Sequence, residues 1–398
     1  MLLGVGPDGS IGGRRVAITG IAVISSVGSG LDAFWSGLHG PAPEGERRVQ
    51  KFDADRWFSI KEARHLDRFA QFSVAAADMA LADAGDLDAD PGRSGVIMGT
   101  GVGGLQTLET QILVYAEKGA RRISPRLVPM MMSNAGAAAV SMRIGWHGPS
   151  ETMITACAAG AHSIGHAARL VASGRCDIAI GGAAEAGMTI VGTAAFANMT
   201  ALSTSGRSMP FDVRRDGFVM TEGAGALVLE EWDRAVARGA RIYGELAGAA
   251  STSDAHHITA PAPGGSGAAA CMQLAMHDAG IEASQVAHIN AHGTSTPLND
   301  QAESDAIGKV FGSDAPPVTS IKGATGHGLG ASGAIEAVAS VLTIAHASIP
   351  PTVGFEEPDP DIQLDVVAHV ARAWEPGPIL SNSFGFGGHN GCLVIVPA

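Results

Sequence analysis

Strands that lack polar residues, separated by helices rich in small residues, restrict the fold of this chain most strongly. The runs RVAITGIAVI at 15–24, SGVIMG at 94–99 and AGALVLE at 224–230 show no alternation of polar and apolar residues. Such strands are typical of a sheet that is covered on both faces. Apolar residues at helical spacing over 68–84 and 158–173 predict helices that cover it. We therefore expect an α/β fold with a mainly parallel sheet.

The pattern starts again after Gly239. In the first half, a strand predicted at 152–156 runs into Cys157 and a small-residue helix. In the second half, a strand at 317–321 runs into Lys322, His327 and another small-residue helix. We expect further second-half strands at 242–249, 287–290, 379–383 and 391–396, and helices at 268–279 and 331–346. The repeat predicts two halves of similar topology, 15–240 and 241–398, after a flexible tail over 1–14, with loops of both halves meeting at one site.

Charge and cysteine content exclude several classes of function. The formal net charge is −13, from 26 basic and 39 acidic residues, so general binding to nucleic acid is not expected. The four cysteines form no C-x-x-C pair, which excludes the common zinc and redox spacings. The apolar stretch 331–349 contains Glu336 and His346 and many small residues, and this favours a buried helix over a membrane span. No basic segment followed by an apolar one marks the N-terminus. We expect a soluble, cytoplasmic protein.

Cys157 is the first candidate for chemistry. It stands in ITACAAGAHSIG, where a predicted buried strand meets a helix. The free amides and the dipole of a helix N-terminus favour an anion, so a thiol there loses its proton more easily. The small residues that follow leave room for a substrate. The alternative is a buried cysteine that packs as a small apolar side chain.

Two histidines and a lysine follow strands of the second half. His292 opens the polar loop HGTSTP, and His327 lies among glycines in SIKGATGHGLGASGAIE. Lys322 is one of only five lysines, and a lysine after a buried strand needs a partner, for which Glu336 is within plausible reach. Imidazoles accept or donate protons near neutral pH. The alternatives are a turn histidine that binds a local carbonyl and a structural ion pair.

The segment NSFGFGGHN at 382–390 is a glycine-rich turn between two predicted strands. Such a turn exposes backbone amides that suit an oxyanion, although a plain β-hairpin has the same pattern. The pattern Gly99-x-Gly101-x-x-Gly104 matches the dinucleotide fingerprint, but no acidic residue ends a second strand about 20 residues later, so no nucleotide site is expected. Together, one thiol, two imidazoles and an amide loop are the groups that acyl transfer requires.

The motifs SIKGATGH, NAHGTSTP, TACAAG and NSFGFGG resemble those of the β-ketoacyl-acyl carrier protein synthases, specifically the type II elongating enzymes. The resemblance covers 15–396. It implies the thiolase-like fold, a duplicated five-layer αβαβα arrangement. It also implies decarboxylative Claisen condensation between an acyl-cysteine and malonyl-acyl carrier protein in fatty-acid chain elongation. It implies no free cofactor and no metal, because the substrates are carried on the phosphopantetheine of the carrier protein.

The resemblance also implies a role for individual residues. Cys157 takes the acyl chain as a thioester, His292 and His327 hold the malonyl thioester carbonyl, and Lys322 paired with Glu336 orients the histidines. The backbone amides of Cys157 and Phe386 form the oxyanion hole. The residues implied to bind substrate are Thr294 and Thr296 for the phosphopantetheine arm, Leu108 for the acyl tunnel, and Phe196, Phe384 and Phe386.

Partners follow from the same resemblance. An acidic carrier protein requires a basic patch, and the segments that correspond contain Lys61, Arg64, Arg121 and Arg122, for which ordinary solvated charge is the alternative. A homodimer is expected, and a heterodimer with a chain-length factor is the alternative. Neither nucleic acid nor a membrane is an expected partner.

Two departures from the family pattern bear on the pathway. The stretch 198–202 has no Arg before Ala-Leu-Ser, and Met209 replaces an Arg that is common before Pro-Phe-Asp. They leave open whether the chain elongates fatty acids or is the ketosynthase subunit of a type II polyketide or polyene pathway. A thiolase is a rival, but thiolases use a second cysteine in a C-terminal glycine-rich loop, whereas Cys392 falls inside the last predicted strand. A silent chain-length partner is a second rival, and it would lack the nucleophile.

Overall fold

The computed structural model describes residues 4–5, 11–50 and 52–398. Its centre is a sheet of 11 strands, in which ten form one path and β4 (Gly28–Ser29) pairs with β3. The first half of the chain contributes β3 (Val16–Ser25), β5 (Ser94–Gly99), β6 (Ser150–Glu151), β7 (Ile178–Glu185) and β8 (Gly223–Glu231). The second half contributes β9 (Gly244–Ser253), β10 (His288–Asn290), β11 (Val318–Thr319), β14 (Ile379–Gly385) and β15 (His389–Val396).

The two halves repeat the same strand order. Read from the junction outwards, the first half runs β3-β8-β7-β5-β6 and the second runs β9-β15-β14-β10-β11. In each half the first two pairings along this path are antiparallel and the last two are parallel. The predicted duplication is therefore confirmed. The halves meet where β3 pairs with β9 at Ala17 and Ile18.

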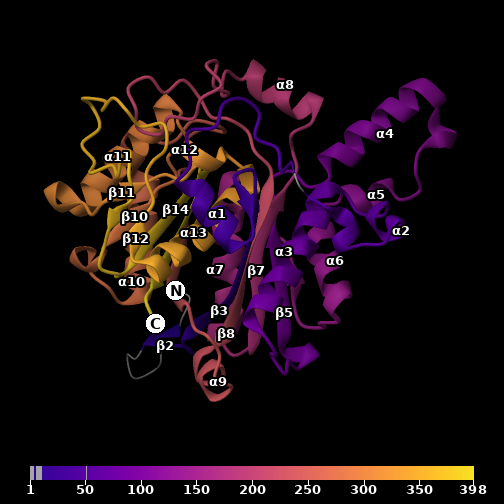
Figure 1. Cartoon of the computed structure of the whole chain (residues 1–398), viewed down its shortest axis with the longest axis horizontal. Coiled ribbons are helices and arrows are strands. Elements are labelled where there is room, and N and C mark those ends of the chain that lie inside the picture. The colour runs from indigo at the N-terminus through magenta and orange to yellow at the C-terminus, as the bar shows by residue number, and fades with distance from the viewer. Residues whose placement is uncertain (1–3, 6–10, 51) are drawn as a thin grey trace.

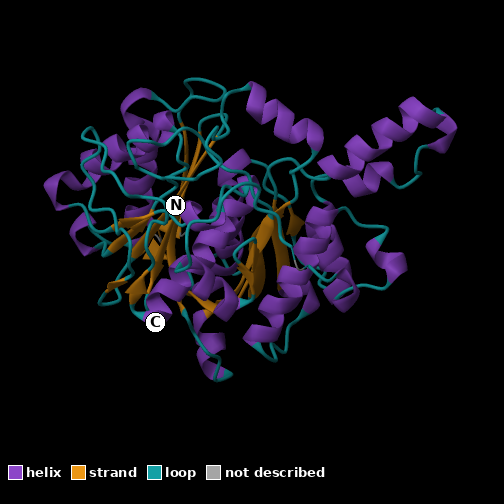
Figure 2. Cartoon of the chain, turned by 45° about the horizontal axis from the view of Figure 1, so that its top comes forward, coloured by secondary structure: helices purple, strands orange, loops and turns teal. Residues whose placement is uncertain are grey.

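Helices lie between and outside the two half-sheets. α7 (Ala159–Ala172) packs on β5 and β7 of one half and on β9 and β15 of the other, and α13 (Ser332–His346) packs on β8 and β14. α3 (Arg68–Ala84) and α6 (Ala135–Ile144) cover the outer face of the first half, and α10 (Ser266–Ala279) with α11 (Pro297–Phe311) covers that of the second. Figure 1 shows α7 and α13 between the half-sheets, and Figure 2 shows helices between and outside the two groups of strands. This is the expected five-layer αβαβα fold.

Small residues let the two central helices approach closely. A Cβ added at Gly160 in α7 would lie 2.4 Å from the backbone nitrogen of Ala334, and one at Gly333 in α13 would lie 2.7 Å from that of Ala161. Neither distance is compatible with a side chain, so glycine is required where the helices cross. The close contact brings together the loops that precede these helices, and these loops carry Cys157 and His327.

α13 is also the segment with the strongest membrane-like composition. Leu329–His346 is long and apolar enough to cross a membrane, but 89% of it is buried inside the protein. It therefore forms part of the core, as expected from its small residues.

Three expectations need correction. The sheet is mixed and not mainly parallel, partly because the tight turn between β14 and β15 makes that pair antiparallel. The strand predicted at 152–156 is wrong, since pairing with β5 ends at Glu151 and the backbone then leaves the sheet. The flexible tail predicted over 1–14 lies largely outside the described residues, of which β1 (Gly4–Val5) and β2 (Ile11–Gly12) pair with each other.

Most of the remaining elements lie at the periphery, whereas α12 (Lys322–Thr325) is buried. α4 (Leu105–Lys118) extends away from the body (Figure 1) and buries none of its residues in the lone chain. The others are α1 (Leu31–Leu38), α2 (Ile60–Ala63), α5 (Leu127–Met131), α8 (Ile190–Asn198), α9 (Trp232–Ala237), α12 (Lys322–Thr325), β12 (Ser348–Ile349) and β13 (Arg372–Ala373).

Candidate active site

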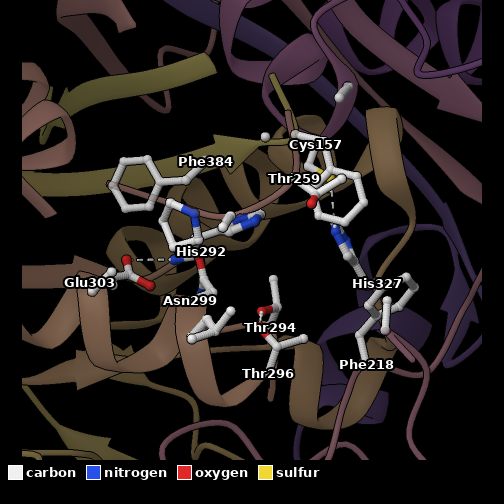
Figure 3. A pocket seen from close by; sticks show the side chains of 18 of the residues that line it. Cys157, Phe218, Thr259, His292, Thr294, Thr296, Asn299, Glu303, His327 and Phe384 are labelled. Atoms are coloured by element: carbon white, nitrogen blue, oxygen red, sulfur yellow. Dashed lines mark hydrogen bonds between the residues drawn. The ribbon is translucent and has the colours of Figure 1, made fainter. Parts of the chain in front are cut away.

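Cys157 lies in a single turn of 3-10 helix, 156–158, directly before α7. Ala156 has φ 50°, a left-handed conformation that is rare for a residue with a side chain. This turn points the thiol into a cavity that loops of both halves surround, as Figure 3 shows. The predicted strand-to-helix position of Cys157 thus becomes a strained turn in front of the helix.

The thiol is buried and contacts an imidazole. Its Sγ lies 3.0 Å from Nε2 of His327. Burial raises the pKa of Cys157 to about 12, although the Lys322 charge and the Phe386 backbone amide oppose this rise. The pKa is therefore raised, opposite to the direction expected from the helix N-terminus. The thiol is neutral at rest, and His327 Nε2 is the adjacent acceptor for its proton.

The backbone and a serine fix His327. Its N–H donates to the carbonyl of Val219 at 2.7 Å, and its carbonyl accepts from the N–H of Thr221 at 3.0 Å. Its Nδ1 lies 2.9 Å from Oγ of Ser332, which also accepts the N–H of Gly328. Burial, followed by the nearby Lys322 charge, lowers the pKa of His327 well below its usual range, so the ring is neutral. Because the serine hydroxyl can donate or accept, Nε2 can either accept or carry the ring proton.

His292 is held by a buried lysine. The Lys322 ammonium donates to Nδ1 of His292 at 3.2 Å and to the His292 carbonyl at 2.6 Å. An ammonium has no acceptor, so this contact leaves the ring proton of His292 on Nε2. Burial, then the charges of Lys322 and His327, keeps the pKa of His292 well below 6.5. Lys322 also bonds to Glu336, and both side chains are almost fully buried, at 1% and 2% exposure.

The three reactive side chains converge. One donor atom each from Cys157, His292 and His327 lies within 4.8 Å of the others. They open onto a cavity of about 450 Å³. Of the residues expected to bind substrate, Thr294, Thr296, Phe196, Phe384 and Phe386 line it. Sulfur and nitrogen donors in this arrangement also suit zinc, but the Lys322 ammonium beside His292 opposes a further cation there.

The 384–388 turn supplies amides to the thiol. β14 and β15 form a hairpin in which Gly385 pairs with His389, and the backbone N–H of Phe386 donates to the Cys157 sulfur. A Cβ at Gly385 would lie 3.0 Å from the backbone nitrogen of Cys157 and 2.8 Å from the Thr155 carbonyl. Glycine is therefore needed here to leave space above the Cys157 and Phe386 amides.

Comparisons with known proteins agree with this geometry. The family descriptions "Beta-ketoacyl synthase, N-terminal domain" and "Beta-ketoacyl synthase, C-terminal domain" match residues 42–235 and 243–356. The chain belongs to the β-ketoacyl synthase family. It is 44% identical to "3-oxoacyl-[acyl-carrier-protein] synthase 2" of Synechocystis sp. over 95% of this chain and 96% of the relative. The Staphylococcus aureus protein of the same name is 42% identical over 96% of this chain and 98% of its own length.

Solved structures support membership of the same family. The ishigamide ketosynthase/chain length factor superposes with a TM-score of 0.93 at 34% identity, covering 97% of this chain and 100% of that chain. A β-ketoacyl synthase from Burkholderia phymatum gives a TM-score of 0.90 at 33% identity with the same coverages. A type II polyketide ketosynthase, solved with its acyl carrier protein, gives 0.89 at 32% identity with the same coverages.

Some residues expected to act in this β-ketoacyl synthase lie elsewhere. Leu108 is in α4 and does not line the cavity in the described structure, whereas Val102 does. Lys61, Arg64, Arg121 and Arg122 are exposed, on and beside α2 and after α4, and none has an ion-pair partner within the described ranges. Figure 1 shows α2 and α4 on the same side of the molecule.

Three polar side chains of the β-ketoacyl synthase site were not predicted from the sequence. Glu303 accepts the N–H groups of His292 and Gly293 at 2.8 and 2.7 Å, and burial raises its pKa to about 7. Ser332 orients His327, as described above. Glu185 ends β7 and is fully buried beside the site. The only available signal was acidic residues in otherwise apolar or glycine-rich surroundings, such as GGAAE at 181–185.

Proposed function

We propose that this chain is a β-ketoacyl-acyl carrier protein synthase that elongates fatty-acyl chains by decarboxylative condensation with malonyl-acyl carrier protein. The observation that carries this proposal is the convergence of one thiol and two neutral imidazoles within 4.8 Å at a cavity of about 450 Å³. The curated relatives named 3-oxoacyl-[acyl-carrier-protein] synthase 2 support the same reaction. No free cofactor is needed, because loss of CO₂ supplies the carbon nucleophile.

The first step loads the enzyme. His327 Nε2, 3.0 Å from Sγ, takes the thiol proton of Cys157 as the sulfur attacks the carbonyl carbon of the incoming acyl thioester. The amides of Cys157 and Phe386 stabilise the oxyanion. The bond from this carbon to the carrier sulfur then breaks, and the carrier thiolate leaves with the proton from His327. An acyl-Cys157 thioester remains.

The second step makes the nucleophile. The thioester carbonyl of malonyl carrier protein accepts hydrogen bonds from the Nε2–H groups of His292 and His327. Lys322 holds the proton of His292 on Nε2, and the Ser332 hydroxyl can do the same for His327 by donating to Nδ1. The bond to the carboxylate breaks, CO₂ departs, and its electron pair forms the enolate. Neutral imidazoles suit this task because they donate to the developing charge without a strong base.

The third step forms the product. The enolate carbon attacks the acyl carbonyl on Cys157, and the oxyanion again occupies the amides of Cys157 and Phe386. The oxyanion collapses, the bond from this carbon to Sγ of Cys157 breaks, and the β-ketoacyl carrier protein is released. The Cys157 thiolate then takes a proton from solvent and becomes the resting thiol again. The loss of one oxyanion donor typically raises the barrier by about 3 kcal/mol. Thr294 and Thr296, at the cavity wall, are assigned to the phosphopantetheine arm.

An acyl carrier protein is the proposed partner. Exposed Lys61, Arg64, Arg121 and Arg122 have no ion-pair partner among the described side chains, which favours an acidic docking partner. A related ketosynthase has been solved in complex with its acyl carrier protein. The sequence departures at 198–202 and Met209 leave the carrier's pathway to experiment.

A homodimer is the proposed assembly. α4 buries none of its residues, and Ile112, Leu113 and Tyr115 on it are more than half exposed, at 56%, 55% and 56%. β6 ends the path of the large sheet, so its edge is open to pairing. An apolar arm and an open edge on one molecule favour burial against a second copy.

We also propose that the halves divide near residue 240, and that the protein works in the cytoplasm.

A type II polyketide ketosynthase is the second candidate, favoured by the structural match to the ishigamide ketosynthase/chain length factor. Such an enzyme would need a second, different subunit. The mass of the purified protein in solution, and its activity without a co-expressed partner, separates the two candidates.

The test of the proposed function follows both products. The protein is incubated with acyl- and malonyl-acyl carrier proteins, and release of CO₂ and the mass of the ketoacyl carrier protein are measured. We expect condensation in the parent protein and in Cys176→Ala, a buried-thiol control, and none in Cys157→Ala. Full condensation by Cys157→Ala would refute the role of Cys157. Cleavage of acetoacetyl-CoA to acetyl-CoA, with no CO₂ release, would indicate a thiolase instead.

A further inference from the structure

A buried arginine lies behind the segment that joins Lys322 to His327. Arg47 comes from the loop between α1 and α2 and is 3% exposed. Its Nη1 donates to the carbonyls of Gly323 and Ala324 at 3.0 and 2.9 Å, and more weakly to that of Lys322 at 3.3 Å. Within the described ranges no carboxylate lies within ion-pair distance of this guanidinium, so backbone carbonyls alone hold it.

The carbonyls of Gly323 and Ala324 need a donor, whereas that of Lys322 also accepts the N–H of Gly326 at 3.0 Å. α12 has only four residues, Lys322–Thr325, and the last carbonyls of a helix have no partner within it. The segment is fully buried, so water cannot serve them, and an unpaired buried carbonyl is costly. A cation at a helix C-terminus also interacts favourably with the helix dipole. Burial lowers the pKa of Arg47 to about 10, so it remains charged at neutral pH.

Arg47 is itself fixed by the first half of the chain. Its backbone forms a bridge with Thr221, whose hydroxyl donates to the Arg47 carbonyl at 2.6 Å. Two residues on, the N–H of Val49 donates to Glu222, which also pairs with Arg68. The main chain that carries Arg47 therefore cannot move away from α12 without breaking this network.

The Arg47 side chain also packs beside the turn that leads to His327. A Cβ at Gly326 would lie 3.1 Å from Cδ of Arg47 and 2.9 Å from the Val219 carbonyl. On the opposite side of α12, a Cβ at Gly323 would lie 1.8 Å from the carbonyl of Val353. The short helix is thus enclosed on both sides, with Arg47 as the only charged group donating to its carbonyls in the part of the chain that is described.

We propose that Arg47 is a positioning residue for condensation, which acts by fixing Lys322 and, through Lys322, the orientation of His292. Arg47 touches the main chain of Lys322, whose ammonium sets the ring proton of His292. His327 depends less on the Arg47 guanidinium, because the contacts that hold it, to the backbone of Val219 and Thr221 and to the Ser332 hydroxyl, do not use the Arg47 side chain. The inference rests on the proposed condensing function, in which decarboxylation uses both imidazoles and acyl loading of Cys157 uses His327.

This difference gives a test that a purely structural role would not pass. Rates are measured separately for CO₂ release from malonyl-acyl carrier protein and for acyl transfer to Cys157, each divided by the number of thiols that iodoacetamide titrates. For Arg47→Met we expect kcat for CO₂ release to fall more than about tenfold below that of the parent. KM for malonyl-acyl carrier protein should stay within about twofold of the parent value, and the rate of acyl transfer within about threefold. Arg48→Met, in the same loop but half-exposed, should change neither rate by more than about twofold.

A double mutant sharpens the result. If Arg47 acts through Lys322, then adding Arg47→Met to Lys322→Met should lower CO₂ release by less than about twofold further. A second tenfold loss in that background, or equal losses in both half-reactions of the single variant, would overturn the proposal. So would an Arg47→Met enzyme that decarboxylates at the parent rate.

Arg47→Lys covers the case in which Arg47→Met does not fold. An ammonium keeps the charge but lacks the planar fork of a guanidinium. We therefore expect a smaller loss of CO₂ release than in Arg47→Met, with acyl transfer preserved. Unchanged CO₂ release would overturn the proposal. A parent protein that releases no CO₂ would instead refute the proposed function.

Discussion

Replacing Glu185 by glutamine should make this protein more stable above neutral pH. Burial raises the pKa of Glu185 to about 7, although four donors oppose the rise: the N–H groups of Gly101, Gly330 and Ala186 and the hydroxyl of Thr100. A folded-state pKa above the unfolded value of 4.5 means that the folded state binds the proton more tightly. Protonation of Glu185 therefore stabilises the fold fully below pH 4.5, and this stabilisation is lost as the pH rises through 7.

The magnitude follows from the two pKa values. Each unit between folded and unfolded states is worth about 1.4 kcal/mol, so ionisation of Glu185 costs the fold about 3 kcal/mol at pH 8. Glutamine avoids that cost and can keep the contacts with Gly101, Gly330 and Thr100. Gly101 and Gly330 both donate to Oε2, where the amide oxygen would sit, while Thr100 faces Oε1, where the amide NH₂ would donate to its hydroxyl.

The assay is urea unfolding of the parent protein and Glu185→Gln from pH 5 to pH 8.5, followed by circular dichroism. We expect similar midpoints at pH 5 and a gap that widens to about 3 kcal/mol in favour of the variant by pH 8. Asp212→Asn is the control of opposite sign. Burial raises the pKa of Asp212, but Arg214 and the amides of Glu356 and Glu357 lower it by more, so the net pKa is lowered. The charged carboxylate therefore stabilises the fold, and Asp212→Asn should lose stability at neutral pH. A Glu185→Gln midpoint that tracks the parent at every pH, or falls below it at pH 8, would show that the donors outweigh burial.

Three further predictions concern other buried groups. His288→Leu should have a free energy of unfolding about 3 kcal/mol above that of the parent at pH 4 and equal to it at pH 8. Burial lowers the pKa of His288 to about 3, so the neutral ring stabilises the fold above pH 6.5 and this stabilisation is lost as the pH falls. A difference between variant and parent that does not depend on pH would contradict this. Gly385→Ala should slow acyl loading of Cys157 by about 100-fold, measured by mass spectrometry, because the methyl group would crowd the oxyanion amides; unchanged loading would argue against that oxyanion hole. Lys322→Met should slow CO₂ release by about 100-fold while iodoacetamide still alkylates Cys157, and a variant that releases CO₂ at the parent rate would exclude Lys322 from the step.

Much of the fold could be predicted because it is encoded locally. α3 spans 68–84 and β5 spans 94–99 as the sequence predicts, since the first ends at Gly85 in a positive-φ conformation and the second is a continuous apolar run. The duplication was also predictable, because small-residue helices follow strand ends in both halves. Cys157, His292, Lys322 and His327 were found through motifs with unusual composition around a single reactive residue.

Other features could not be predicted because they depend on contacts between distant segments. The expected strand at 152–156 failed because the segment lies outside the sheet: Ile154 is 53% exposed, and Met153 and Ala156 are only partly buried. Gly101 looked like part of a nucleotide motif, whereas a Cβ there would lie 2.7 Å from Oε2 of Glu185. The thiol pKa could not be deduced from a helix N-terminus alone, because burial, the largest cause of the shift, depends on residues that are far apart in the chain.

Arg47 and Glu185 illustrate how a duplicated fold builds one site from two halves. Both belong to the first half, and both bind backbone groups of the second-half segment 322–330 that carries Lys322 and His327: Arg47 binds carbonyls at its beginning, and Glu185 binds the Gly330 amide at its end. Between these contacts, Leu329 adopts φ 46°, a conformation that a side chain resists and that surrounding contacts must impose. Buried polar side chains that bond to backbone groups are costly to displace, so they fix the segment more firmly than apolar packing alone would. The two imidazoles thereby keep their distance from a thiol that lies on the other half of the molecule.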